Sequence, residues 1–128
     1  MLDFLKKNRI FFTYVLIGTI ATLLDMAILY ILSDLLSLNY ILSNCISVFC
    51  GISLSFFLNS RYNFKKTDRI AIKFIYFASV CIIGLLVGSS IFVFLYENLR
   101  IYKFISKALS VIIAGVLQFL FNKHVTFR

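Results

Sequence analysis

The sequence has few of the residues from which soluble proteins build turns, cross-links and catalytic sites. It contains no proline, three cysteines and five acidic residues among 128, and 14% of its residues are charged whereas 62% are hydrophobic. A soluble domain has about 25% charged residues, so this composition lies far outside that class. All three cysteines fall within long apolar runs, which favours buried hydrophobic side chains over a disulfide or metal framework. The sequence therefore predicts an integral membrane protein without a metal or other cofactor.

The motifs of enzymes are missing as well. The sequence has no phosphate loop, nucleophile elbow, paired-carboxylate motif or metal-ligand spacing, and no polar segment long enough to bind a nucleotide. His124 has no carboxylate nearby in the sequence to orient it, so we expect it at the surface. We predict no catalytic residues and no enzymatic activity from this chain alone.

Four apolar runs are long enough to cross a hydrocarbon core of about 30 Å, which requires about 20 helical residues. Only Asp25 and Lys107 carry formal charge within these runs, which cover residues 10–32, 40–58, 74–96 and 104–121. Helices are expected because lipid offers backbone groups no partner, and because the alternating pattern of a barrel strand is missing. The first run is too long for the apolar region of a signal peptide. The prediction is an all-α, polytopic membrane protein with one domain over residues 1–128.

An internal repeat with an offset of 63 residues organises the chain. The segment FLNSRYNFK, residues 57–65, matches LFNKHVTFR, residues 120–128, and each lies where an apolar run meets charge. Steps of three or four residues place five related pairs, the last of them within these segments, on one helical face of each copy. These pairs are Asn44 with Lys107, Ser47 with Ser110, Gly51 with Ala114, Ser55 with Gln118 and Asn59 with Asn122. We expect two helical hairpins in a parallel repeat, with halves of about residues 1–65 and 66–128, joined by a basic linker of about fifteen residues, 59–73.

Basic residues gather on one side of the predicted membrane. Ten belong to the N-terminal tail, the linker and the C-terminal tail, and two belong to the loop between the third and fourth spans. The positive-inside rule therefore places the N and C termini and the linker in the cytoplasm. The net charge of +8 then indicates anionic lipids as partners, and not nucleic acid. Surface contacts with these lipids are expected for Lys65, Lys66, Arg69 and Lys73.

Polar side chains inside the spans are the first candidates for substrate binding. Asp25 and Lys107 are expected in the outer half of the membrane, and Asn44 at the depth of Lys107. A charge near the middle of a membrane costs on the order of 2.5–3.5 kcal/mol, so these groups should face inward or toward water. One interpretation is a polar cavity in which Asp25 and Asn44 hydrogen-bond a hydroxylated headgroup while Lys107 attracts its phosphate. The alternative is an ion pair that locks the first span to the fourth, or a Lys107 that snorkels to the outer interface.

A second candidate group lies at the cytoplasmic ends of the second and fourth spans. An asparagine followed by a cation occurs in both copies, and Gln118 lies on the same polar face one turn earlier. Cations and amides of this kind suit the oxygens of a phosphate. The alternative is that the cations stabilise helix C-termini and anchor them at headgroups without a ligand. The residues of this group are Asn59, Arg61, Asn122, Lys123 and His124, and Gln118 on the repeated polar face is a further candidate for substrate binding.

At these residues the sequence resembles the GtrA-like family of small four-helix membrane proteins, over nearly the whole chain. The likeness rests on Phe12, Gly18 and Asp25, on residues 57–64 and on residues 121–127. The paired Asn-x-basic-x-x-Phe endings are its most specific part. The chain departs from the pattern by having His124 in place of Arg, and Tyr62 and Val125 where an aromatic such as Trp is usual.

The resemblance implies a role with a polyprenyl-phosphate sugar in a bacterial cytoplasmic membrane. The first hypothesis is a flippase that moves an undecaprenyl-phosphate-linked sugar outward, for glycosylation of surface polysaccharide or teichoic acid. The second is a non-transporting accessory subunit that positions a membrane glycosyltransferase, through the face of Gly84 and Gly88 or through the linker. The third is a small exporter of cationic drugs. An acidic residue in the first span is the only feature that the sequence shares with such exporters. Four short helices leave little room for an enclosed cavity, so a homo-oligomer is compatible with all three.

Overall fold

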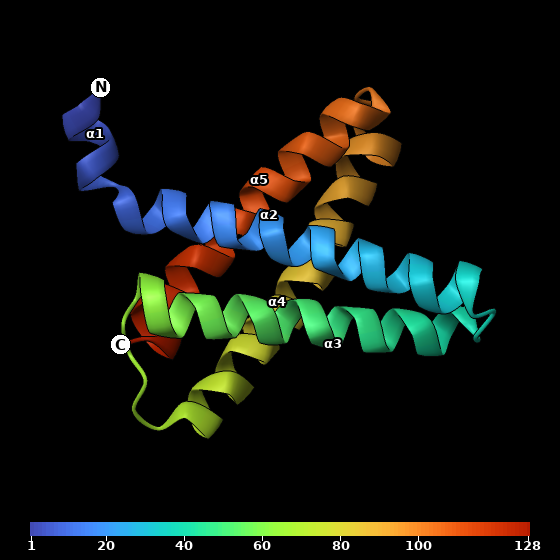
Figure 1. Ribbon diagram of the computed structural model, residues 1–128. Helices are drawn as coiled ribbons and strands as arrows, with labels where there is room; N and C mark the ends of the chain where they lie inside the picture. The colour runs from blue at the N-terminus through green and yellow to red at the C-terminus, as the bar shows by residue number, and fades with distance from the viewer. The chain divides into compact units, whose positions relative to one another are not determined.

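The structure is a computed structural model that describes all residues 1–128. It is all-helical, with five α-helices and four π-helical turns (Figure 1). In chain order these are α1 Leu2–Lys7, α2 Arg9–Tyr30, η1 Ile31–Leu35, α3 Tyr40–Leu58, η2 Asn59–Asn63, α4 Ile70–Val93, η3 Phe94–Asn98, α5 Lys103–Phe121 and η4 Asn122–Thr126. Four helices, each continued by its π turn, are long and apolar enough to cross a membrane. The predicted all-α fold with four spans is confirmed.

The chain divides into two compact units, residues 1–68 and 69–128. In the first unit α2 packs against α3, and in the second α4 packs against α5. Each unit is therefore a pair of antiparallel helices, which we call hairpin 1 and hairpin 2 (Figure 1). The short helix α1 precedes hairpin 1 and contacts α2, where the rings of Phe4 and Phe12 lie 6.0 Å apart.

The offset of 63 residues recurs in the bounds of the elements. Helices α3 and α5 begin and end at related positions, and so do η1 and η3, and η2 and η4. Ser37 and Arg100, also 63 residues apart, both have positive φ, of 54° and 53°. The two halves of the chain thus have the same sequence of helices and turns, although their side chains differ.

The π turns end each long helix by satisfying its last carbonyl groups, which have no partner in a regular α-helix. In η2 the N–H of Phe64 donates to the carbonyl of Asn59 at 2.7 Å, and in η4 that of Phe127 donates to Asn122 at 2.8 Å. Lys65 then has a φ of 56°. A residue in this left-handed conformation turns the chain out of the helix.

Small residues allow the two helices of each hairpin to approach closely. A Cβ on Gly51 of α3 would lie 3.2 Å from the Ala21 oxygen and from Asp25 Cβ in α2, and one on Gly88 of α4 would lie 3.3 Å from Ala114 Cβ in α5. Hydrocarbon gives no hydrophobic drive for helix association, so van der Waals contact of this kind holds such helices together. Contact between faces of small residues therefore holds the two helices of each hairpin together.

The stretch between the hairpins is shorter than the linker predicted from charge. Helix α3 continues as η2 through Asn63, and α4 begins at Ile70, so the irregular part covers residues 64–69. Lys65, Lys66 and Arg69 are exposed. Lys73, which we predicted at the membrane surface, is instead buried within α4. The prediction was wrong there because charge marks only the limit of the apolar run. Helical hydrogen bonding extends beyond that limit, as the bond from the Lys73 N–H to the Arg69 carbonyl shows, so Lys73 belongs to the helix.

Candidate functional site

Hairpin 1 holds two of the predicted substrate ligands at different levels. Asp25 is half-buried on α2, with its Cβ against Gly51 of α3. Asn44 is exposed on α3. The seven residues from Asn44 to Gly51 correspond to about 10 Å along a helix, so the carboxylate and the amide lie about two turns apart. Asp25 is thus level with the centre of α3, while Asn44 is close to its beginning.

Hairpin 2 positions Lys107 against aromatic rings. The Lys107 side chain is exposed on α5, and its ammonium lies 5.7 Å from the centroid of the Phe92 ring of α4. Phe92 in turn stacks on Tyr96, with an interplanar angle of 9°. A cation over an aromatic face is held by about 0.5–1 kcal/mol at an exposed site. The pairing of Lys107 with Asp25 would join the two hairpins and stays a prediction.

The repeated asparagines at the other end are fully buried. The Asn59 amide donates to the Ser55 carbonyl at 2.9 Å, and its oxygen accepts a hydrogen bond from the Asn63 amide, also at 2.9 Å. Asn63 donates in addition to the Ile10 carbonyl of α2 at 3.1 Å. This chain of hydrogen bonds fastens η2 to the beginning of α2.

Hairpin 2 repeats the arrangement with a different donor. Asn122 is also fully buried, and its side-chain oxygen accepts a hydrogen bond from the Thr126 hydroxyl at 2.8 Å. Sequence reasoning missed both Asn63 and Thr126, although they are related by the same offset and lie four residues after each asparagine. The spacing was therefore a usable signal that these asparagines organise a turn.

The cations beside these asparagines are accessible. Arg61 and Lys123 are exposed, and each lies over an aromatic ring of its own helix. The distance is 5.9 Å from the Arg61 guanidinium carbon to the Phe57 centroid, and 5.9 Å from the Lys123 ammonium to the Phe119 centroid. The rings restrict where the cations point without covering them. His124 is exposed, as expected.

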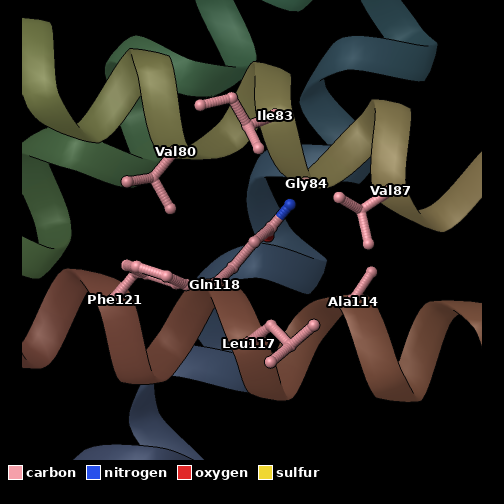
Figure 2. A pocket seen from close by; sticks show the side chains of 8 residues that line it. All are labelled: Val80, Ile83, Gly84, Val87, Ala114, Leu117, Gln118 and Phe121. Atoms are coloured by element: carbon pink, nitrogen blue, oxygen red, sulfur yellow. The ribbon is translucent and has the colours of Figure 1, made fainter.

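Gln118 points from α5 toward Gly84 of α4 (Figure 2). A Cβ on Gly84 would overlap the Gln118 amide and would lie 2.6 Å from its Cγ. Beside this contact is a cavity of about 130 Å³, and Gln118 is the one polar residue among the eight that line it. The amide therefore reaches into an otherwise apolar space between the two helices of hairpin 2.

The face of Gly84 and Gly88 is covered by α5 of the same hairpin, since Gln118 lies over the first glycine and Ala114 over the second. This corrects the prediction that the face serves as a contact for a partner protein. The small residues were correctly identified as a helix-packing device, but their partner is the helix that follows them in the chain.

A comparison with known protein families now decides where this fold belongs. The family model described as GtrA/DPMS, transmembrane domain, matches residues 13–127. The chain belongs to this family. A comparison with curated proteins gave no match. The match begins within α2 and ends just after η4, so it covers most of the first span, the other three spans in full and both Asn-x-basic endings.

Family membership and the four apolar helices together make this a multi-pass membrane protein. Membership in the GtrA/DPMS family also indicates a role in membrane processes that involve polyprenyl-phosphate sugars. The GtrA family is in general non-catalytic.

Proposed function

We propose that the protein moves an undecaprenyl-phosphate-linked sugar from the cytoplasmic to the outer leaflet, for glycosylation of surface polysaccharide or teichoic acid. The observation that carries this proposal is the pair of exposed cations, Lys107 and Lys123, near opposite ends of one spanning helix and its π turn. Sixteen residues of helix correspond to about 24 Å, close to the thickness of the hydrocarbon core. A lipid phosphate therefore has a basic partner near each end of its path.

At the cytoplasmic side, Arg61 of hairpin 1 or Lys123 of hairpin 2 would receive the phosphate. Both cations project from π turns that buried asparagines hold in shape, so their positions are fixed by the fold and not by a ligand. Arginine offers a planar pair of donors and lysine a point charge, and both suit phosphate oxygens. In this proposal Asn59 and Asn122 act by positioning these cations.

Inside the membrane, polar side chains would replace the water that surrounds the sugar. Transfer of a hydroxyl to an apolar medium without a partner costs roughly 2–7 kcal/mol, and each hydrogen bond made on the way lowers that barrier. Asp25 supplies such a partner level with the centre of α3, Gln118 supplies one about a turn before the end of α5, and Asn44 supplies one closer to the outer end. Passage requires binding that is weak enough to release, which suits single contacts at several depths.

The test is the transbilayer movement of an undecaprenyl-phosphate hexose in liposomes that contain the purified protein. Accessibility of the headgroup from outside reports the rate. We expect a rate above that of empty liposomes, and a fall of at least tenfold in Asp25→Ala, because the sugar loses its acceptor at the least hydrated point. Arg61→Ala should also lower the rate.

The matched control is Asp34→Ala. Asp34 is an exposed acid of η1, outside the proposed path, and accepts a hydrogen bond from the neighbouring Ser33 hydroxyl at 3.0 Å. Its replacement should leave the rate unchanged. Equal slowing by the two alanine variants would rule out a specific path, and no acceleration by folded protein would rule out transport.

An accessory subunit is the alternative, and the exposed segment of Lys65, Lys66 and Arg69 favours it. With the Gly84 face covered, this segment is the remaining predicted contact for a membrane glycosyltransferase. Replacing the three cations with serine should abolish co-purification of such an enzyme if this function holds. Co-purification that persists would remove the linker from consideration.

A further inference from the structure

The proposed function, which describes contacts with the phosphate and the sugar, assigns no role to a cavity in hairpin 2. This cavity has a volume of about 130 Å³ and lies between α4 and α5, with Gln118 as its one polar lining residue (Figure 2). The Gln118 side chain makes no hydrogen bond within the chain. The cavity is thus a space that the hairpin itself leaves unfilled.

Water is a poor occupant for this space. A buried water molecule needs two to four polar partners, and a single amide cannot supply them. The lining residues Ile83, Leu117 and Phe121 are exposed, at 59%, 41% and 57%. Exposed apolar side chains of a spanning helix face hydrocarbon, so the occupant is a hydrocarbon group.

The size of the cavity selects a small, branched group. An engineered cavity of about 150 Å³ holds one benzene molecule, so a space of this size accepts one five-carbon isoprene unit and not a folded lipid tail. A methyl branch broadens a chain and fills a rounded space better than a straight chain does, because each additional buried methyl adds apolar contact.

The position of the cavity relates it to the cytoplasmic cation. Gln118 and Lys123 are five residues apart, which corresponds to about 7.5 Å along the helix. Phe121, at the edge of the cavity, lies two residues before Lys123. A phosphate bound by Lys123 would therefore hold the first carbons of its own tail within about 7.5 Å of the depth at which the cavity lies.

We propose that this cavity binds the isoprene unit next to the phosphate, and that hairpin 2 thereby distinguishes polyprenyl phosphates from phosphates of straight-chain lipids. The inference rests on the proposed function for the class of lipid. It adds a site for the tail, where the proposed function describes only the headgroup.

The test compares two phosphates that share a twelve-carbon main chain. Farnesyl phosphate carries methyl branches and double bonds, whereas dodecyl phosphate carries neither. Binding to the full-length protein in detergent should be about tenfold tighter for farnesyl phosphate, because burial of a methyl group favours binding. Equal affinity for the two probes would overturn the inference.

Variants locate the preference in the cavity. Val87→Phe fills the cavity from α4 and should bring the ratio of the two affinities close to one, with the affinity for dodecyl phosphate retained. Val80→Phe fills the same cavity from a position two turns earlier on α4 and should change the ratio of affinities in the same way. It replaces Val87→Phe if that variant folds poorly. The matched control is Val93→Phe, a lipid-facing position of α4 that is 47% exposed and outside the cavity, which should keep the preference. Loss of preference in the control as well would overturn the inference.

The two proposals can fail separately. Selective binding of farnesyl phosphate in a protein that accelerates no lipid movement would overturn the flippase and leave the tail site standing. Transport of the undecaprenyl-linked sugar by a protein without preference for farnesyl phosphate would overturn the tail site alone.

Discussion

Gly84 has room only for a hydrogen, because the Gln118 side chain occupies the position that a Cβ would take. The two residues should therefore be energetically coupled. We predict that Gly84→Ala destabilises the protein by about 1–3 kcal/mol, as overpacking of a tight contact does. In a Gln118→Ala background the same change should be neutral or stabilising by up to about 1 kcal/mol, because alanine is the better helix former.

A double-mutant cycle measured by reversible unfolding in mixed detergent micelles checks this coupling. Gly18→Ala is a suitable control, since nothing lies within 4 Å of a Cβ built on Gly18. That variant should show no dependence on residue 118. Additive effects of Gly84→Ala and Gln118→Ala would contradict the contact.

At the scale of single residues, the sequence identified positions better than roles. The repeat predicted that Asn59 and Arg61 belong to one group, yet Asn59 is fully buried and Arg61 is exposed. Repetition arises both from residues that bind a ligand and from residues that hold a turn. Burial distinguishes residues that hold a turn from residues that bind a ligand. It depends on the width of the π turn, which composition and periodicity do not reveal.

At the scale of elements, η2 shows how a side chain closes a hairpin. Asn63 donates to Asn59 and to the Ile10 carbonyl, but its own side-chain oxygen is buried without a hydrogen-bond partner. The related position in hairpin 2 uses Thr126, which donates to Asn122 and lacks such an oxygen. Hairpin 2 thus shows which residue can replace Asn63 at this position of the turn, namely a threonine.

We predict that Asn63→Thr is close to neutral and that Asn63→Val costs about 1–3 kcal/mol, because valine leaves the buried Asn59 oxygen without a donor. Threonine and valine have the same shape, so the difference measures the hydroxyl. Thermal or detergent unfolding of the two variants in parallel gives the comparison. Equal stability of the two variants would show that the Asn59 oxygen finds another donor.

The elements themselves were predictable to different degrees. Apolar runs gave the four spans because a membrane requires uninterrupted hydrophobic length. The early beginning of α4 and the separate helix α1 escaped prediction, because both lie in charged segments where hydropathy carries no signal and local hydrogen bonds decide. The contact of the Gly88 face with Ala114 also required the structure, since small-residue spacing indicates close packing without naming the partner.

At the scale of the whole molecule, the distribution of charge predicts the orientation in the membrane. Ten basic residues lie in the two terminal segments and around the segment between the hairpins, and two lie near the beginning of α5. This ratio predicts a cytoplasmic location for both termini and for the segment between the hairpins. The proposed path depends on this orientation, because it assigns Arg61 and Lys123 to the collecting side. Inverted insertion would place Lys107 there instead.

Single cysteines test the orientation, because the three native cysteines all lie within spanning helices and none lies in a loop. We predict that Ser37→Cys reacts with a membrane-impermeant maleimide added to intact cells, whereas Thr67→Cys reacts only after the membrane is permeabilised. Both positions are exposed, so accessibility to the reagent depends on the side of the membrane alone. Labelling of Thr67→Cys from outside would reverse the assignment of the collecting and releasing ends, and labelling of both in intact cells would show that the chain inserts in two orientations.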